Sequence, residues 1–92
     1  MGNTLYVFTL NGCEQCDELK KRLNNENISY EELEITKYEG IWNEVIKKTN
    51  QDFVPTLFID DHDGPGQLFT PMTDYSDINE MMEIIHKNFK GE

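Results

Sequence analysis

The stretch YVFTLNGCEQCDELKKRL (residues 6–23) places a β-prone run, a turn, two cysteines and a helical pattern in immediate succession. Its first part belongs to TLYVFTL (residues 4–10), which is largely apolar and therefore typical of a strand buried on both faces. The Asn-Gly pair at 11–12 ends that run. The sequence thus predicts a strand–turn–helix unit with Cys13 and Cys16, the only cysteines of the chain, at its junction.

A helix is predicted from Glu14 to about Asn24. Three side chains recur at helical spacing and form one apolar face: Cys16, Leu19 and Leu23. Acidic residues come early in this segment and basic residues come late, an order that suits the helix dipole.

The rest of the chain continues to alternate between strands and helices. Residues 28–35 and 53–59 are predicted strands, and residues 67–70 are a short return strand after a turn at 60–66. The order β-α-β-α-β-β-α predicts an α/β fold in which a four-stranded mixed sheet is flanked by about three helices. We expect residues 1–92 to form a single domain.

Two further helices follow from their periodicity and their caps. Thr36 and Glu39 form a capping box before the second helix, and Asp77 with Glu80 is placed to cap the third. The periodic positions of the second helix are Tyr38, Ile41, Trp42, Val45, Ile46 and Thr49, with Trp42 expected in the core. Those of the third are Ile78, Met81, Met82, Ile85 and Phe89, with the methionines expected to pack inside.

The composition excludes several classes of function. The chain has 18 acidic and 8 basic residues, which disfavours binding to nucleic acid or to an anionic membrane surface. This charge keeps a small protein soluble and monomeric, or alternatively docks it to a basic patch on a partner. Because we find neither an apolar run of about 20 residues nor a secretory signal, we expect the protein in the reducing cytoplasm.

Two cysteines at this spacing allow three interpretations: a structural disulfide, a metal site or a redox-active pair. A disulfide between Cys13 and Cys16 as a structural staple closes a very short loop and contributes only about 2 kcal/mol. A structural zinc site needs four ligands, and His62 and His86 lie far from the pair in sequence, so no metal is expected. The third reading is redox chemistry.

The redox reading has a physical basis in the position of the pair. Cys13 stands at the start of the predicted helix, where free N–H groups and the helix dipole favour a thiolate. The thiolate is the form that attacks a disulfide. Cys16 lies one turn further and can resolve the resulting mixed disulfide, and a C-x-x-C beside a βα unit in a cytosolic protein is typical of redox proteins.

Two motifs carry a resemblance to a known family: YVFTLNGCEQC before a helix, and FVPTLFID about forty residues later. With them the chain resembles the glutaredoxin family of the thioredoxin superfamily, in particular the small dithiol redoxins of phages and bacteria. The resemblance implies a thioredoxin-like fold with Cys13 as the nucleophile and Cys16 as the resolving cysteine. It also implies a cis bond between Val54 and Pro55, which would turn the Val54 backbone toward an extended thiol substrate. The residues alone allow an ordinary trans proline at a strand start.

The same resemblance implies a place for glutathione. The family has a Gly-Gly turn before its last helix, and Thr73 and Asp74 stand there in this chain. Ser76 and Asp77 then fall at the helix start that receives the ammonium and carboxylate of glutathione, although plain helix capping explains both residues equally well.

Three departures from the family pattern weaken the glutathione assignment. The glycine pair is absent, Leu10 replaces a common lysine, and Asp52 lies where a basic residue is often found. In addition, Glu14 and Asp17 add negative charge beside Cys13 and oppose the thiolate. We therefore expect glutathione to bind less well than in a typical relative.

The resemblance implies a dithiol glutaredoxin that reduces protein disulfides or glutathione mixed disulfides. Glutathione would be its co-substrate, with a flavoprotein reductase as the other source of electrons, and ribonucleotide reductase would be a plausible recipient. Two alternatives stay open: a redoxin fed by thioredoxin reductase, and a binding module that kept the fold but lost turnover.

Overall fold

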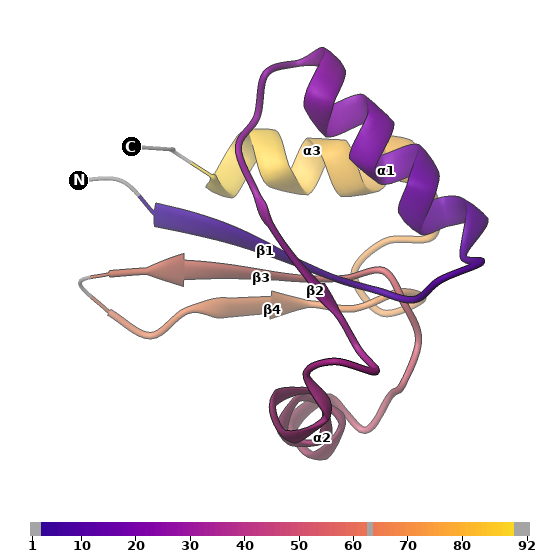
Figure 1. The fold of residues 1–92 in the computed structure, drawn as a ribbon. Helices are drawn as coiled ribbons and strands as arrows, with labels where there is room; N and C mark the ends of the chain where they lie inside the picture. Colours follow the sequence, from indigo (N-terminus) through magenta and orange to yellow (C-terminus); the bar gives the residue numbers. More distant parts are fainter. Residues whose placement is uncertain (1–2, 63, 90–92) are drawn as a thin grey trace.

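A four-stranded sheet runs through the middle of the protein (Figure 1). This computed structural model describes residues 3–62 and 64–89; positions 1–2, 63 and 90–92 of the predicted domain lie outside the described residues. The strands are β1 (Asn3–Thr9), β2 (Glu31–Glu34), β3 (Thr56–Asp61) and β4 (Gln67–Phe69). They lie in the order β2-β1-β3-β4, with β1 parallel to β2, antiparallel to β3, and β4 antiparallel to β3.

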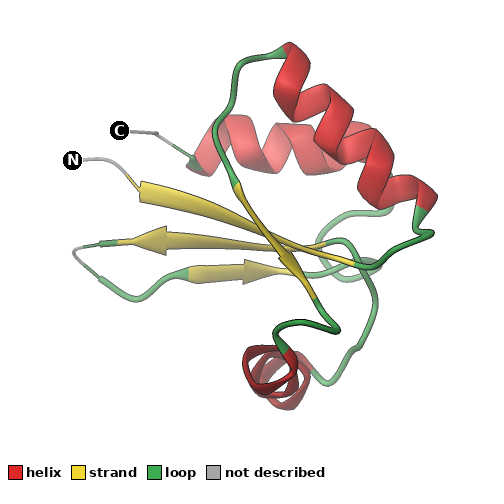
Figure 2. Ribbon diagram, in the orientation of Figure 1, coloured by secondary structure: helices red, strands yellow, loops and turns green. Residues whose placement is uncertain are grey.

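Three helices cover the two faces of this sheet. They are α1 (Glu14–Asn25), α2 (Glu39–Thr49) and α3 (Ile78–Asn88). Helices α1 and α3 lie on one face, and α2 lies on the opposite face (Figures 1 and 2). The predicted order β-α-β-α-β-β-α and the mixed sheet are confirmed. None of the helices in the described ranges is both long and apolar enough to cross a bilayer.

The core consists of one apolar cluster on each face of the sheet. Under α1 and α3, the buried residues are Leu5, Val7, Leu19, Leu23, Leu57, Ile59, Tyr75, Met81, Met82 and Ile85. Under α2, they are Phe8, Trp42 and Val45, and the Phe8 and Trp42 rings lie 5.3 Å apart. Successive side chains of a strand point to opposite faces, so β1 supplies both clusters. The predictions of a doubly buried first strand and of Trp42, Met81 and Met82 in the core are confirmed.

The second strand begins at Glu31, and the prediction that it begins at residue 28 was wrong. The end of α1 explains the difference. Asn27 adopts a left-handed conformation (φ 58°), and the Ile28 N–H donates back to the Leu23 carbonyl at 2.9 Å. This is a Schellman cap, in which the apolar residue after the turn packs back on the helix. Ile28 therefore closes α1 instead of opening β2.

The third strand also begins and ends later in the sequence than predicted. It runs from Thr56 to Asp61 rather than over 53–59, because Phe53 and Val54 precede a proline that has no N–H for the ladder. At its other end, Asp60 and Asp61 still pair with β1, so the turn begins later than expected. Strand β4 ends at residue 69, one residue short of the prediction.

One predicted helix cap is wrong and one is confirmed. Helix α2 begins at Glu39 after Tyr38, without a side-chain cap, because Thr36 instead donates its hydroxyl and its N–H to the carboxylate of Glu34. Asp77 caps α3 as expected and accepts the N–H of Glu80 at 2.9 Å.

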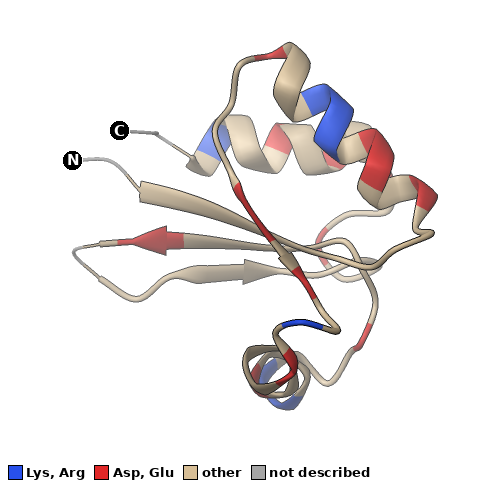
Figure 3. Ribbon diagram, viewed as in Figure 1, with Lys and Arg blue, Asp and Glu red and all other residues tan. Residues whose placement is uncertain are grey.

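Charged residues on α1 are ordered as predicted, with acids in its first turn and bases further along (Figure 3). One of them joins the helix to the sheet. Lys20 donates to the Glu32 carboxylate of β2 at 2.9 Å, and the buried Thr9 hydroxyl of β1 donates to the same carboxylate at 2.7 Å. The hydrogen bond from Lys20, followed by that from Thr9, lowers the pKa of Glu32 below its ordinary value.

We predict that Glu32→Gln lowers the free energy of unfolding at pH 7 by about 0.5 kcal/mol, because the pair is largely exposed and solvent screens it. A carboxylate whose pKa is lowered by folding stabilises the fold above its unfolded value, near 4.5, and this contribution disappears as the pH falls through the lower folded value. Urea titrations of both proteins at neutral pH and near pH 3.5 measure the difference, which should shrink at the lower pH. A difference independent of pH would contradict an ionic origin.

Candidate functional site

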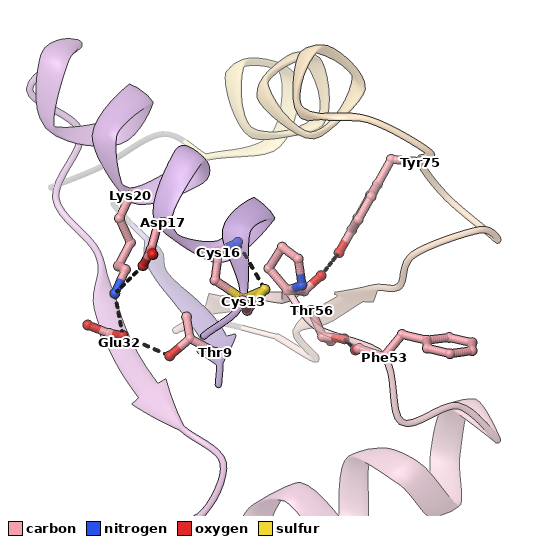
Figure 4. The surroundings of a disulfide bond; sticks show 10 residues. Thr9, Cys13, Cys16, Asp17, Lys20, Glu32, Phe53, Thr56 and Tyr75 are labelled. Atoms are coloured by element: carbon pink, nitrogen blue, oxygen red, sulfur yellow. Dashed lines mark hydrogen bonds and ion pairs between the residues drawn. A yellow bond between two sulfur atoms is a disulfide. The ribbon is translucent and has the colours of Figure 1, made fainter. Parts of the chain in front are cut away.

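The two cysteines form a disulfide at the junction of β1 and α1 (Figure 4). Their Cα atoms lie 5.2 Å apart. Gly12 has a φ of 85°, which a residue with a side chain rarely adopts, and it turns the chain from the strand into the helix. Cys13 is the N-cap of α1, and its Sγ accepts the N–H of Cys16 at 3.1 Å. The junction therefore directs a backbone donor at the first sulfur.

The two cysteines differ in their exposure to solvent. Cys13 is partly exposed, whereas Cys16 is fully buried beside Leu19 and Leu23 on the inner face of α1. An incoming disulfide can thus reach the first cysteine, and the second is held back at bonding distance from it.

The Val54–Pro55 peptide bond is cis, as the resemblance implied. Pro55 is buried, Val54 is partly buried, and the Phe53 side chain is exposed. The Thr56 hydroxyl donates to the Phe53 carbonyl at 2.7 Å and closes the segment on itself. Figure 4 shows Phe53 and Thr56 in the surroundings of the disulfide.

Tyr75 ties this segment to the loop before α3. Its side chain is only 3% exposed, and its hydroxyl lies 2.5 Å from the Pro55 carbonyl oxygen and 3.0 Å from that of Phe69. Burial raises the pKa of the Tyr75 hydroxyl above its ordinary value, so the group stays protonated and acts as a donor. One buried hydroxyl thereby links the cis-proline segment, the end of β4 and the approach to α3, and Figure 4 shows its contact with the proline segment.

The loop at residues 70–75 stands where the family pattern has its glycine pair. It is closed by internal hydrogen bonds: the Asp74 carboxylate accepts the Thr70 N–H at 2.9 Å, and the Met72 N–H donates to the Tyr75 carbonyl at 2.7 Å. Met72 takes the left-handed conformation (φ 70°), and its side chain is 79% exposed. A large apolar side chain therefore projects from the residue just before the two positions, Thr73 and Asp74, where the family pattern has glycines.

A groove of about 250 Å³ lies beside the cysteine pair. Three segments line it: Gln15 between the cysteines, Phe53 and Val54 before the cis proline, and residues of the loop and α3, namely Pro71, Met72, Tyr75, Ser76 and Met81. The groove thus brings the C-x-x-C motif, the Val-Pro segment and the start of α3 to one place.

Ser76 already has a carboxylate partner from its own chain. The Glu80 carboxylate accepts the Ser76 N–H at 2.6 Å and the Ser76 hydroxyl at 2.8 Å. These hydrogen bonds, with the backbone N–H of Ser76 first, lower the pKa of Glu80. Both donors of Ser76 are therefore engaged by a side chain one turn along α3.

The structure brings most of the predicted site residues together. Val54 and Ser76 line the groove, Pro55 follows Val54, and the cysteines flank the segment that contributes Gln15 to the lining, whereas Asp77 is the N-cap of α3. Sequence reasoning missed the buried hydroxyl link of Tyr75 and the apolar rim formed by Phe53 and Met72. It also treated Glu80 only as part of a cap, although the short spacing to Ser76 could have suggested the contact. Among residues 3–62 and 64–89, no three metal-binding side chains gather.

Comparison with known sequences matches residues 5–63 to the family model described as Glutaredoxin. Two curated proteins, both described as Glutaredoxin 1, are similar over 60 residues: that of Rickettsia conorii is 37% identical and that of Rickettsia typhi is 35% identical. Each alignment covers 63% of this chain, but only 59% and 58% of the length of the respective relative.

Solved structures share the fold at low sequence identity. A mutant of a thioredoxin-like protein has a TM-score of 0.66 at 21% identity, covering 89% of this chain and 99% of its own. Thioredoxin O2 from Arabidopsis thaliana, in its oxidised state, has a TM-score of 0.58 at 19% identity, covering 97% and 76%. The arrangement of helices and strands is thus thioredoxin-like.

We predict that Tyr75→Phe lowers the free energy of unfolding by about 1–2 kcal/mol, because it leaves two backbone carbonyls without their buried donor. Tyr38→Phe is the matched control, since that ring is exposed, and it should change stability by less than about 0.5 kcal/mol. Chemical denaturation measures both variants. Equal effects from the two would show that the Tyr75 hydroxyl does not hold the groove together.

Proposed function

Because the chain belongs to the glutaredoxin family, we propose that it is a dithiol thiol–disulfide oxidoreductase that reduces protein disulfides or glutathione mixed disulfides. One observation carries the proposal. The Cys13–Cys16 disulfide stands at the N-terminus of a helix, with the first residue partly exposed and the second buried. This asymmetry supports the division into an attacking and a resolving cysteine.

In the proposed cycle, the Cys13 thiolate attacks one sulfur of the substrate disulfide, and the other substrate sulfur leaves as a thiolate that takes up a proton. The Cys16 thiolate then attacks the Cys13 sulfur of the mixed disulfide and expels the second substrate sulfur. The substrate gains the two electrons that the cysteine pair loses on forming its own disulfide. The Cys16 N–H directed at Cys13 Sγ supports the first step, because an amide donor stabilises a thiolate.

The cis-proline segment has a proposed role in holding the substrate. The backbone of Val54 would pair with an extended segment of the substrate, as in strand addition. Pro55 has no N–H and so leaves no unpaired donor beside the sulfur. The position of Val54 along the groove supports this role.

Glutathione is the proposed reductant, with Ser76 and Asp77 at the helix start that would hold it. We also propose that the protein works as a cytoplasmic monomer without a metal, and that ribonucleotide reductase is a plausible recipient of its electrons. Family membership supports the glutathione assignment.

A second candidate function is a redoxin of the same chemistry that takes its electrons from thioredoxin reductase. The engaged donors of Ser76 favour it, because the Glu80 carboxylate occupies the place that a carboxylate of glutathione would need. The acidic Asp52, where a cation is often found, favours it as well.

We predict that Cys13→Ser abolishes the reduction of hydroxyethyl disulfide, with a loss of about a thousandfold or more, because a serine hydroxyl is not ionised at neutral pH. In a reaction without glutathione or another free thiol, Cys16→Ser should still attack but stall, and should accumulate substrate covalently bound at Cys13. Turnover assays and mass analysis of the protein check both outcomes. Activity that survives Cys13→Ser, or a wild-type protein without activity, would favour a binding module instead.

The source of electrons is decided by a separate assay. With an excess of NADPH, the wild-type protein is supplied with either glutathione and glutathione reductase or thioredoxin reductase alone. Turnover with glutathione at millimolar concentration is the expected result. Turnover with thioredoxin reductase only would instead establish the second candidate.

A further inference from the structure

We propose that the groove beside the cysteine pair selects disulfides in polypeptide segments that carry lysine or arginine together with an apolar side chain, and that it discriminates against anionic disulfides. The proposal rests on the exchange function proposed above and names its substrate class. Three features of the groove carry it: the charge around it, the partner of Ser76, and its apolar rim.

The segments that line the groove carry acidic rather than basic residues, although two cations of α1 reach them: Lys20 lies 3.7 Å from Asp17, and Arg22 donates to Asn79 of α3. The lining side chains are uncharged, but acids stand within two positions of them along the chain: Glu14, Asp17, Asp52, Asp74, Asp77, Glu80 and Glu83. No lysine or arginine lies within two positions of a lining residue. Figure 3 shows acidic positions at the start of α1 and on the segment after α2, and basic positions further along α1 and on α2. A cationic segment is therefore attracted to this end of the molecule, and an anionic one is repelled.

At the start of α3, acidic side chains of the chain itself already accept several of the donors that an anion would use. A helix N-terminus ordinarily attracts a carboxylate through its unpaired N–H groups. Here Glu80 already accepts two hydrogen bonds from Ser76, and the Asp77 carboxylate accepts the N–H of Glu80. A substrate carboxylate would have to displace Glu80 and then lie beside both acids. These residues make the helix start selective against anions.

The rim of the groove is apolar and exposed. Phe53 is 50% exposed and Met72 is 79% exposed, and both line the groove. Leu10, 39% exposed, adjoins the pair, since its carbonyl accepts the Cys13 N–H. The backbone of the loop that carries Met72 is held by hydrogen bonds on both sides of that residue, so the loop presents Met72 at the groove. Such a rim fits an apolar side chain next to the substrate cysteine.

Disulfide-linked dimers of three short peptides test the substrate class. Each peptide has one cysteine next to a leucine, and the flanking residues are lysines, glutamates or neutral serines. Fully reduced protein is mixed with each dimer, and the peptide thiols released are trapped by alkylation and counted over time. Each dimer takes two electrons from the protein and yields two peptide thiols as the Cys13–Cys16 disulfide forms.

At about 10 mM ionic strength, where the Debye length is about 30 Å, we expect the lysine dimer to react at least about tenfold faster than the glutamate dimer. At about 1 M, where that length is about 3 Å, the ratio should approach one. Asp52→Asn and Glu80→Gln should each lower the ratio at low salt. Glu44→Gln, which removes one exposed acid on α2 outside the groove lining, is the matched control and should lower the ratio less than either of these changes.

Glutathione disulfide tests the role of Glu80 separately. Glu80→Gln removes the charge but keeps an oxygen acceptor for Ser76, whereas Glu80→Ala also frees the donors of Ser76. The rate with glutathione disulfide should therefore rise from wild type to Glu80→Gln and again to Glu80→Ala. An unchanged rate in both variants would overturn the assigned role of Glu80.

The apolar part of the proposal has its own measurement. Replacing the leucine of the neutral peptide by serine should slow its reaction with the wild-type protein. The difference should be smaller in Met72→Gln, whose exposed position tolerates the change. Equal rates for leucine and serine peptides with the wild-type protein would overturn the role of the rim.

The failure of this inference differs from the failure of the proposed function. If all three dimers are reduced at similar rates at low salt, or if the glutamate dimer is the fastest, the substrate class is wrong and the exchange function stands. If even the neutral dimer is not reduced, the exchange function itself is wrong, and the inference that rests on it falls as well.

Discussion

The direct passage from a doubly buried strand into a helix is the constraint on which this structure depends. Strand β1 contributes side chains to the clusters on both faces of the sheet, so it cannot shift without disturbing either one. A short turn at Leu10–Gly12, closed by the hydrogen bond from the Cys13 N–H to the Leu10 carbonyl, leads from the strand to Cys13, which is already the cap of α1. Because Cys16 is packed with the inner face of that helix, the core itself holds the second sulfur next to the first.

The opposite wall of the site depends on side chains rather than on the sheet. Tyr75 joins the cis-proline segment to the loop before α3 through a buried hydroxyl, and Glu80 covers the donors of Ser76. The reactive sulfur is thus placed by the main fold, whereas the surroundings that a substrate meets are placed by a few polar contacts. The sulfur pair and its surroundings thus depend on different parts of the structure.

The parts that could be predicted from the sequence are those that depend on local pattern. The burial of β1, the inner face of α1 and the Asp77 cap follow from residues adjacent in the chain. The start of β2 was missed because the turn at Asn27 uses Ile28 to close a helix. The Tyr75 link was missed because its partners lie 20 and 6 residues away, and no local rule brings them together. The cis bond came from the family resemblance, since the residues alone favour trans.

Strand β2 has a consequence for how copies of the protein meet. It forms one border of the sheet, so the backbone groups on its outer side have no neighbouring strand among the described residues. A bare border of this kind is a template for intermolecular pairing and aggregation. Edge strand β2 has the sequence EELE, and its three glutamates repel the same strand of another copy. The opposite border, β4, is only three residues long. The negative charge of β2 and the short length of β4 thus disfavour the addition of a strand from another copy at either edge of the sheet.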